Sequence, residues 1–163
     1  MTDDVHVGPV DPADAGELFT VQRAAYVSEA QRYGFAIPPL LETYAELRKE
    51  LADPTVLCHG AWLGRRLVGS VRGRVAGASM EIARFAVAPD VQGRGVGRAL
   101  LTSIEAATPA DVDTLWLVTG SLSADNIRFY ERSGYHRADT VLDPVGIEII
   151  RLRKFRAQKL RDR

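Results

Sequence analysis

Residues 80–101 read MEIARFAVAPDVQGRGVGRALL, a run in which an apolar segment is followed by a glycine-rich segment and then by a second apolar segment. Met80 to Ala88 is apolar and predicts a strand that ends at Pro89, because proline has no N–H to donate to a ladder. From Val96 to Ile104 apolar residues recur at helical spacing and predict a helix. The segment between them therefore predicts a tight, glycine-rich turn that leads from a strand into a helix.

The turn contains three glycines within five residues, Gly93, Gly95 and Gly97. Glycine lets the backbone turn tightly and approach a ligand closely. The first N–H groups of the following helix have no partners within that helix, and they carry the positive end of its dipole. We therefore expect the turn to cradle an anion, most naturally a phosphate or pyrophosphate, with Arg94 and Arg98 adding charge at its rim.

Two other phosphate-binding motifs fit this turn poorly. A dinucleotide site requires an Asp or Glu roughly 20 residues past the glycines to hold a ribose, whereas Val118, Thr119 and Gly120 stand near that distance. A Walker loop requires Gly-Lys followed by Ser or Thr, and no such sequence follows the turn. The interpretation that these glycines serve only the geometry of the turn stays open.

A second block, SADNIRFYERSGY, occupies residues 123–135. The spacing Gln92-x-x-Gly95-x-Gly97 after the strand resembles the acyl-CoA-binding signature of the GNAT superfamily of N-acyltransferases. The second block resembles that family's other landmark, the Asn…Phe-Tyr-x-x-x-Gly-aromatic helix. Two blocks in the family's order are harder to obtain by chance than one, and the resemblance extends roughly from Val5 to Phe155.

The resemblance implies an α/β fold with one acyltransferase domain over residues 1–163. Such a domain has a mixed, mostly antiparallel sheet of about six to seven strands, about four helices, and one splayed parallel strand pair that holds the cofactor. The length of 163 residues and the 46% of hydrophobic residues suit one domain with its own core. Residue patterns predict strands over 6–10, 56–63, 67–76, 80–88, 114–119, 135–141 and 146–153, and helices over 11–29, 40–51, 96–104 and 124–133.

The resemblance also implies the reaction, which is transfer of an acetyl group from acetyl-CoA to a primary amine by direct attack. A bulge in the central strand is expected to expose the backbone N–H groups of Phe85, Ala86 and Val87 to the pantetheine arm and the thioester carbonyl. The remaining cofactor contacts are assigned to Gln92, Gly93, Arg94, Gly95, Val96, Gly97, Arg98 and Asn126.

Two side chains are candidates for proton transfer. Tyr130 matches the family's usual general acid, and a phenol with an ordinary pKa of about 10 can protonate a thiolate while staying neutral itself; the alternative is an aromatic packing residue. Glu81 stands eleven residues before Gln92, as does the glutamate base of the family's histone-acetylating branch. An ion pair of Glu81 with Arg72 or Arg74 is the alternative.

The acceptor side is less distinctive. The resemblance places one wall of the acceptor site in the first two helices and the loop between them. This region contains Tyr26, Tyr33, Phe35 and Tyr44, and packing is the alternative role for each. Small-molecule and peptide amines need the same donor machinery, so the acceptor stays open. Two rival functions also stay open, a transferase for a longer acyl-CoA and a catalytically silent acyl-CoA-binding module.

Composition predicts the compartment. The single Cys58 and the lack of a Cys/His cluster at zinc spacing predict no disulfide and no metal, which suits the cytoplasm. We expect neither export nor membrane insertion, because the sequence shows no signal peptide and no run long enough to span a bilayer. Cys58 is assigned to packing, and His59 and His136 are expected in strands with their ring nitrogens hydrogen bonded.

Charge is distributed unevenly along a chain whose formal net charge is zero. Residues 151–163 hold seven basic residues and one acidic residue. We interpret the basic tail, residues 154–163, as a solvated end rather than a nucleic-acid contact. A homodimer formed by pairing of an exposed last strand is the favoured assembly.

Overall fold

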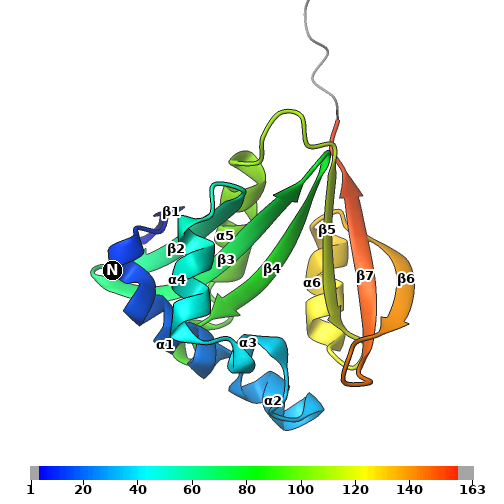
Figure 1. The fold of residues 1–163 in the computed structure, drawn as a ribbon, viewed down its shortest axis with the longest axis horizontal. Helices are drawn as coiled ribbons and strands as arrows, with labels where there is room; N and C mark the ends of the chain where they lie inside the picture. The colour runs from blue at the N-terminus through cyan, green and yellow to red at the C-terminus, as the bar shows by residue number, and fades with distance from the viewer. Residues whose placement is uncertain (1–3, 158–163) are drawn as a thin grey trace, which may run out of the picture. The chain divides into compact units, whose positions relative to one another are not determined.

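The structure, a computed structural model, describes residues 4–157 (Figure 1). Its strands form one sheet in the order β1-β2-β3-β4-β5-β7-β6. The contacts divide the chain into two compact units. The first unit runs to Arg74 and resumes over Ala83–Thr108, and the second contains Val75–Ile82 and the chain from Pro109 onward.

Four α-helices lie between the first strand and the second, and the next three strands follow one another without a helix between them. Strands β1 to β4 are Val5–Pro9, Val56–Leu63, Arg66–Ala76 and Ser79–Val87, and β5 to β7 are Thr114–Gly120, His136–Leu142 and Glu148–Phe155. Helices α1 to α6 are Ala15–Ala25, Val27–Tyr33, Pro38–Leu41, Tyr44–Ala52, Val96–Ala106 and Ala124–Arg132, and two 3₁₀ turns are η1, Pro12–Asp14, and η2, Pro89–Val91. The predicted α/β fold with a mixed sheet is therefore confirmed.

The two helices predicted before residue 54 are each divided, which corrects the predicted boundaries. The first is interrupted at Tyr26, which lies between α1 and α2. The second is divided into α3, which ends at Leu41, and α4, which begins after Thr43. Thr43 and Glu46 form a reciprocal capping box, with hydrogen bonds of 2.8 and 3.2 Å, and this box satisfies the N–H donors of a new helix start.

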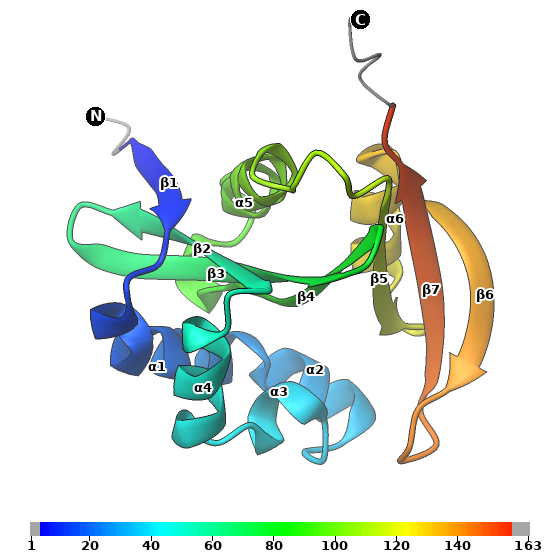
Figure 2. The ribbon, with the colours of Figure 1, turned by 45° about the horizontal axis from the view of Figure 1, so that its top comes forward.

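In the first unit, helices cover both faces of the sheet (Figure 2). Helix α5 packs on β1 and β2, whereas α1 and α4 pack on each other on the opposite face. Gly69 permits the close approach of α5, because a Cβ at this position would lie 3.0 Å from Leu100 Cδ1 and 2.9 Å from the carbonyl oxygen of Ala86. The core of this unit includes the buried side chains of Leu18, Leu47, Leu67, Leu100 and Ile104.

A buried ion cluster joins the helices of the first unit to its sheet. Arg72 of β3 is 1% exposed and donates to both oxygens of Glu42, at 2.6 and 2.7 Å. Gln22 of α1 bridges the pair, accepting from Arg72 at 2.8 Å and donating to Glu42 at 3.1 Å. Glu50 of α4 pairs with Arg72 and Arg74. The ionic partners of Arg72 therefore include Glu42 and Glu50, which sequence reasoning did not identify.

Burial alone would raise the pKa of Glu42, since it disfavours the charged carboxylate. The hydrogen bonds and charge of Arg72, with smaller contributions from Gln22 and Arg84, outweigh burial and lower the pKa of Glu42 to about 2. This carboxylate is therefore ionised wherever the protein is folded near neutral pH.

In the second unit, β4 and β5 form the predicted parallel pair. Ser79, Met80 and Glu81 lie opposite Thr114, Leu115 and Trp116. Strand β7 pairs antiparallel with both β5 and β6, and α6 packs on β6.

Two predictions concern the chain's surroundings rather than its fold. Among the described residues, no helix combines the length and the apolar character that crossing a membrane requires. Residues 158–163 of the predicted basic tail lie outside the described residues.

Glu42→Gln tests the ion cluster. The substitution leaves buried guanidinium groups without one carboxylate, so we expect the free energy of unfolding to fall by about 3 kcal/mol at neutral pH. Since the folded-state pKa of Glu42 is about 2 and its ordinary value is 4.5, its ionic contribution is complete above pH 4.5 and is lost as the pH falls towards 2. Urea denaturation between pH 7 and pH 2 should therefore show a shallower acid loss in the variant.

Glu148→Gln is the matched control, because Glu148 is exposed and belongs to no such cluster. Its acid profile should follow that of the parent. Equal stability of Glu42→Gln and the parent at neutral pH would contradict a structural role for the cluster.

Candidate active site

The glycine-rich turn of the first unit has the backbone conformation that the sequence predicts. Gly93 and Gly95 have φ angles of 78° and 82°, which side chains other than glycine rarely adopt. Gly95 is the N-cap of α5, and no side chain caps this helix. Gln92, Gly93, Arg94 and Gly95 are exposed. The start of α5 thus has the character of an anion site, with backbone donors at an uncapped helix end.

Two polar contacts hold the turn against its own unit. Arg66, at the start of β3, makes two hydrogen bonds of 2.7 Å to the carboxylate of Asp90, in η2. The Gln92 amide donates to the carbonyl of Val87 at 3.3 Å. Sequence reasoning missed Arg66, since two charges 24 positions apart give no sign of pairing.

Strand β4 is irregular just before the predicted donor residues. Arg84 has a φ of 53° and is the only residue other than glycine with a positive φ among residues 4–157. A residue in this conformation is typical of a β-bulge, where regular pairing is interrupted. The positive φ lies at Arg84, next to Phe85, and the predicted bulge at Phe85, Ala86 and Val87 stays a prediction.

The carbonyl groups after Arg84 alternate between the two edges of β4. Those of Phe85 and Val87 accept side-chain hydrogen bonds, whereas that of Ala86 lies against Gly69 of β3. In an extended strand the N–H and C=O of one residue point to the same edge. We therefore expect the N–H groups of Phe85 and Val87, more than that of Ala86, to face the edge opposite β3.

Tyr26 fixes the first of these carbonyls. Its hydroxyl donates to the Phe85 oxygen at 2.8 Å from the junction of α1 and α2. Burial raises the pKa of Tyr26 to about 12, so the hydroxyl keeps its proton as a donor at neutral pH. The sequence suggested Tyr26 only as a wall residue, and its contact with a residue 59 positions away gives no local signal.

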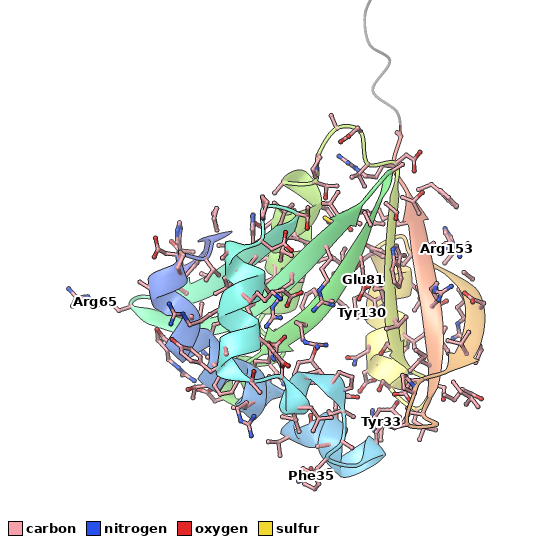
Figure 3. All side chains as sticks on the ribbon, in the orientation of Figure 1. Tyr33, Phe35, Arg65, Glu81, Tyr130 and Arg153 are labelled. Carbon is pink, nitrogen blue, oxygen red and sulfur yellow. The ribbon has the colours of Figure 1, made fainter. Side chains whose placement is uncertain are left out.

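The second unit holds the remaining candidates. Tyr130 of α6 is 8% exposed and its ring packs on Phe129 and Tyr135, at centroid distances of 5.3 and 6.1 Å. Asn126 is exposed and lies one helical turn before Tyr130, so both are on one face of α6. Glu81 comes from β4, opposite Trp116 of β5. Tyr130 of α6 and Glu81 of β4 are labelled in Figure 3.

Cys58, His59 and His136 were also considered from the sequence, and the first two lie in environments typical of residues that support the fold. Burial raises the pKa of the Cys58 thiol to about 12, which keeps it protonated and unreactive as a nucleophile. His59 lies with its Nδ1 2.6 Å from the Ser103 hydroxyl, as expected for a hydrogen-bonded ring, and burial lowers its pKa. His136 is exposed on β6.

The aromatic residues of the predicted acceptor wall differ in environment. Tyr44 packs its ring on Phe19 at 5.8 Å and is 44% exposed. Phe35 is 69% exposed just after α2, and Tyr33 is the last residue of that helix (Figure 3).

Each unit therefore collects one part of the predicted set. The first unit holds the glycine-rich turn, the irregular edge of β4 and Tyr26. The second unit holds Glu81, Asn126 and Tyr130. The first set offers backbone donors to anions and carbonyl groups, and the second offers groups that can exchange protons.

Comparison with known proteins identifies relatives of the chain. Residues 19–135, more than half of its length, match the profile of the acetyltransferase (GNAT) family. UPF0157 protein YqkA of Bacillus subtilis (strain 168) is 28% identical over 138 residues, which are 82% of this chain and 38% of that protein. The chain thus spans less than half the length of this curated relative.

Solved structures share the fold. The PaiA N-acetyltransferase of Thermoplasma acidophilum, solved in complex with coenzyme A, superposes with a TM-score of 0.73 at 16% identity, covering 94% of this chain and 99% of that one. The ribosomal-protein-S18-alanine N-acetyltransferase of Escherichia coli gives a TM-score of 0.74 at 19% identity, covering 96% and 98%. With its profile match and its fold, the chain belongs to the GNAT acetyltransferase family.

Proposed function

We propose that the protein transfers an acetyl group from acetyl-CoA to a primary amine by direct attack. The observation that carries this proposal is the glycine-rich turn, in which two left-handed glycines lead into an uncapped helix next to an irregular strand end. A coenzyme A complex of a structural neighbour supports the same donor.

The turn is assigned to the pyrophosphate of the donor. Backbone N–H groups at the start of α5 match the geometry and charge of a phosphate group. The exposed guanidinium of Arg98 and that of Arg94 add positive charge there. No side chain caps α5, so a phosphate that binds there displaces no capping hydrogen bond from a side chain.

The edge of β4 is assigned to the acyl group. The N–H of Phe85 would polarise the thioester carbonyl and stabilise the oxyanion that forms when the amine attacks. The N–H of Val87 would hold the pantetheine arm. Tyr26 contributes by fixing the Phe85 carbonyl, since a rigid donor needs no reorganisation during the reaction.

Proton transfer is assigned to the second unit. The amine nitrogen forms a bond to the carbonyl carbon, the carbon–sulfur bond breaks, and the thiolate accepts a proton from the Tyr130 hydroxyl. The amine gives up its proton through water to Glu81, the proposed base. Asn126 is assigned to a hydrogen bond with the cofactor arm.

Tyr130→Phe tests the general acid. We expect kcat to fall by about 100-fold, because general acid catalysis is lost, while the KM for acetyl-CoA changes little. The measurement is thiol release from acetyl-CoA with a panel of primary amines, repeated with longer acyl-CoAs as donors.

Tyr135→Phe is the control, because it removes a hydroxyl from the ring that packs on Tyr130. Its kcat should stay within about threefold of the parent's, as for a substitution outside the chemistry. If the protein binds coenzyme A but acetylates no amine, the transferase proposal is wrong and an acyl-CoA-binding module is the better interpretation.

Tyr26→Phe tests the support of β4. Loss of the hydroxyl leaves the Phe85 carbonyl without this donor, so we expect about 1–2 kcal/mol less stability. We also expect kcat to fall about tenfold with little change in KM, because the neighbouring N–H is less well oriented. Thermal unfolding and steady-state kinetics measure the two effects.

Tyr44→Phe is the stability control, because Tyr44 is 44% exposed and its ring contact survives the change. A Tyr26→Phe variant that loses stability but keeps the parent's kcat would limit Tyr26 to a structural role.

A further inference from the structure

Arg84 combines a half-buried charge with a strained backbone. Its side chain is 18% exposed, and among residues 4–157 its only ion pair is with Glu42, at 3.6 Å between Nε and Oε2. This distance exceeds that of a hydrogen bond, and the buried Nε has no hydrogen-bond partner within the described part of the chain. Its guanidinium group therefore lacks the close, planar partner that buried arginines usually have.

The carboxylate nearest Arg84 is already occupied. Both oxygens of Glu42 accept from Arg72, at 2.6 and 2.7 Å, and one of them also accepts from Gln22. Glu42 is thus shared between two guanidinium groups and directs its hydrogen bonds to only one of them. Burial, the largest effect, lowers the pKa of Arg84 despite the charge of Glu42. An additional anion near Arg84 would compensate this charge.

The backbone places Arg84 beside the reacting groups. Its positive φ is a conformation that a residue with a side chain adopts at a cost of about 1 kcal/mol or more, and such strain is concentrated at functional sites. The next residue, Phe85, supplies the N–H assigned to the thioester carbonyl. An attacking amine must come within about 3–3.5 Å of that carbonyl carbon. With this assignment, an acceptor that reaches the carbonyl carbon also approaches the residue that carries the under-compensated charge.

We propose that Arg84 binds a carboxylate of the acceptor, so that the substrate class is amines that carry a carboxylate group. This inference rests on the proposed function. A guanidinium offers two parallel N–H donors that match a carboxylate, whereas its charge repels a polyammonium substrate. Free amino acids and peptides with an acidic group present the same chemistry, and polyamines are disfavoured.

The test compares acceptors that carry a carboxylate with their amides and with a polyamine. Thiol release from acetyl-CoA is measured for glycine against glycinamide, for 4-aminobutyrate against its amide, for the dipeptide Gly-Glu against Gly-Gln, and for spermidine. We expect the parent to favour a carboxylate over its amide by about 10- to 100-fold in kcat/KM, as for hydrogen bonds to a charged group. The amino acid and dipeptide arms distinguish a free acceptor from a peptide.

Variants then assign the preference to Arg84. Arg84→Gln should remove the preference by lowering kcat/KM for the acids and not for the amides, while Arg84→Lys, which keeps the charge, should retain part of it. Arg65→Gln is the matched control, because Arg65 is exposed in the turn between β2 and β3 (Figure 3). If Arg84→Gln unfolds, the test rests on the ratio of kcat/KM for acids to that for amides, measured in the parent and in Arg84→Lys.

Several outcomes overturn the inference. They are equal turnover of acids and amides by the parent, a preference for spermidine, and a carboxylate preference that survives in Arg84→Gln. Failure of the parent to acetylate any acid in the panel also counts against the inference. Calorimetry with coenzyme A then tests the donor site separately, because binding would leave the acyl-CoA assignment intact while the acceptor class fails.

Discussion

The first unit depends on how the charge of Arg72 is neutralised inside it. A guanidinium that is 1% exposed needs hydrogen-bonded carboxylates to compensate its charge. The chain supplies one just before α4 and one near the end of α4. Glu42 lies between α3 and α4, and Glu50 lies within α4. The predicted long helix is divided between α3 and α4, and Glu42 lies at this break, where it accepts from Arg72. The neutralisation of one buried charge thus joins α1, the segment before α4 and α4 itself to β3.

The constraint extends from the cluster to the candidate site through neighbouring groups. Gln22 ties α1 to the cluster, and the junction that follows α1 carries the Tyr26 hydroxyl to the Phe85 carbonyl. Arg84 meets the cluster at Glu42 and has the one positive φ outside glycine among residues 4–157. The irregular edge of β4 is thus held from the helices as well as from the sheet. Rigid support of this kind is what backbone donors need in order to stabilise a developing charge.

Sequence reasoning predicted the parts of the structure that depend on local pattern. The seven strands, the turn with Gly93 and Gly95, and the end of α6 before Gly134 all follow from spacing and turn chemistry. The division at Thr43 also had a local signal, a Thr followed three residues later by Glu46, which is a capping box. The partners of Arg72 and Tyr26 had none, because these contacts join residues far apart in sequence. For the same reason the predicted roles of Tyr130 and Glu81 rest on resemblance rather than on pattern.

Donor and acceptor recognition leave different traces in a sequence of this family. The proposed donor contacts are mostly backbone N–H groups, and the sequence reports them through the glycines that allow their geometry. Recognition of an acceptor depends on side chains, which change without altering the fold. Structural neighbours that are 16% and 19% identical can therefore share the architecture and still differ in acceptor. A charged side chain at the position of Arg84 acts on the acceptor by attraction and by exclusion. In the proposed acceptor site, the partly buried charge of Arg84 would favour acids, and its repulsion of cations would discriminate against polyamines.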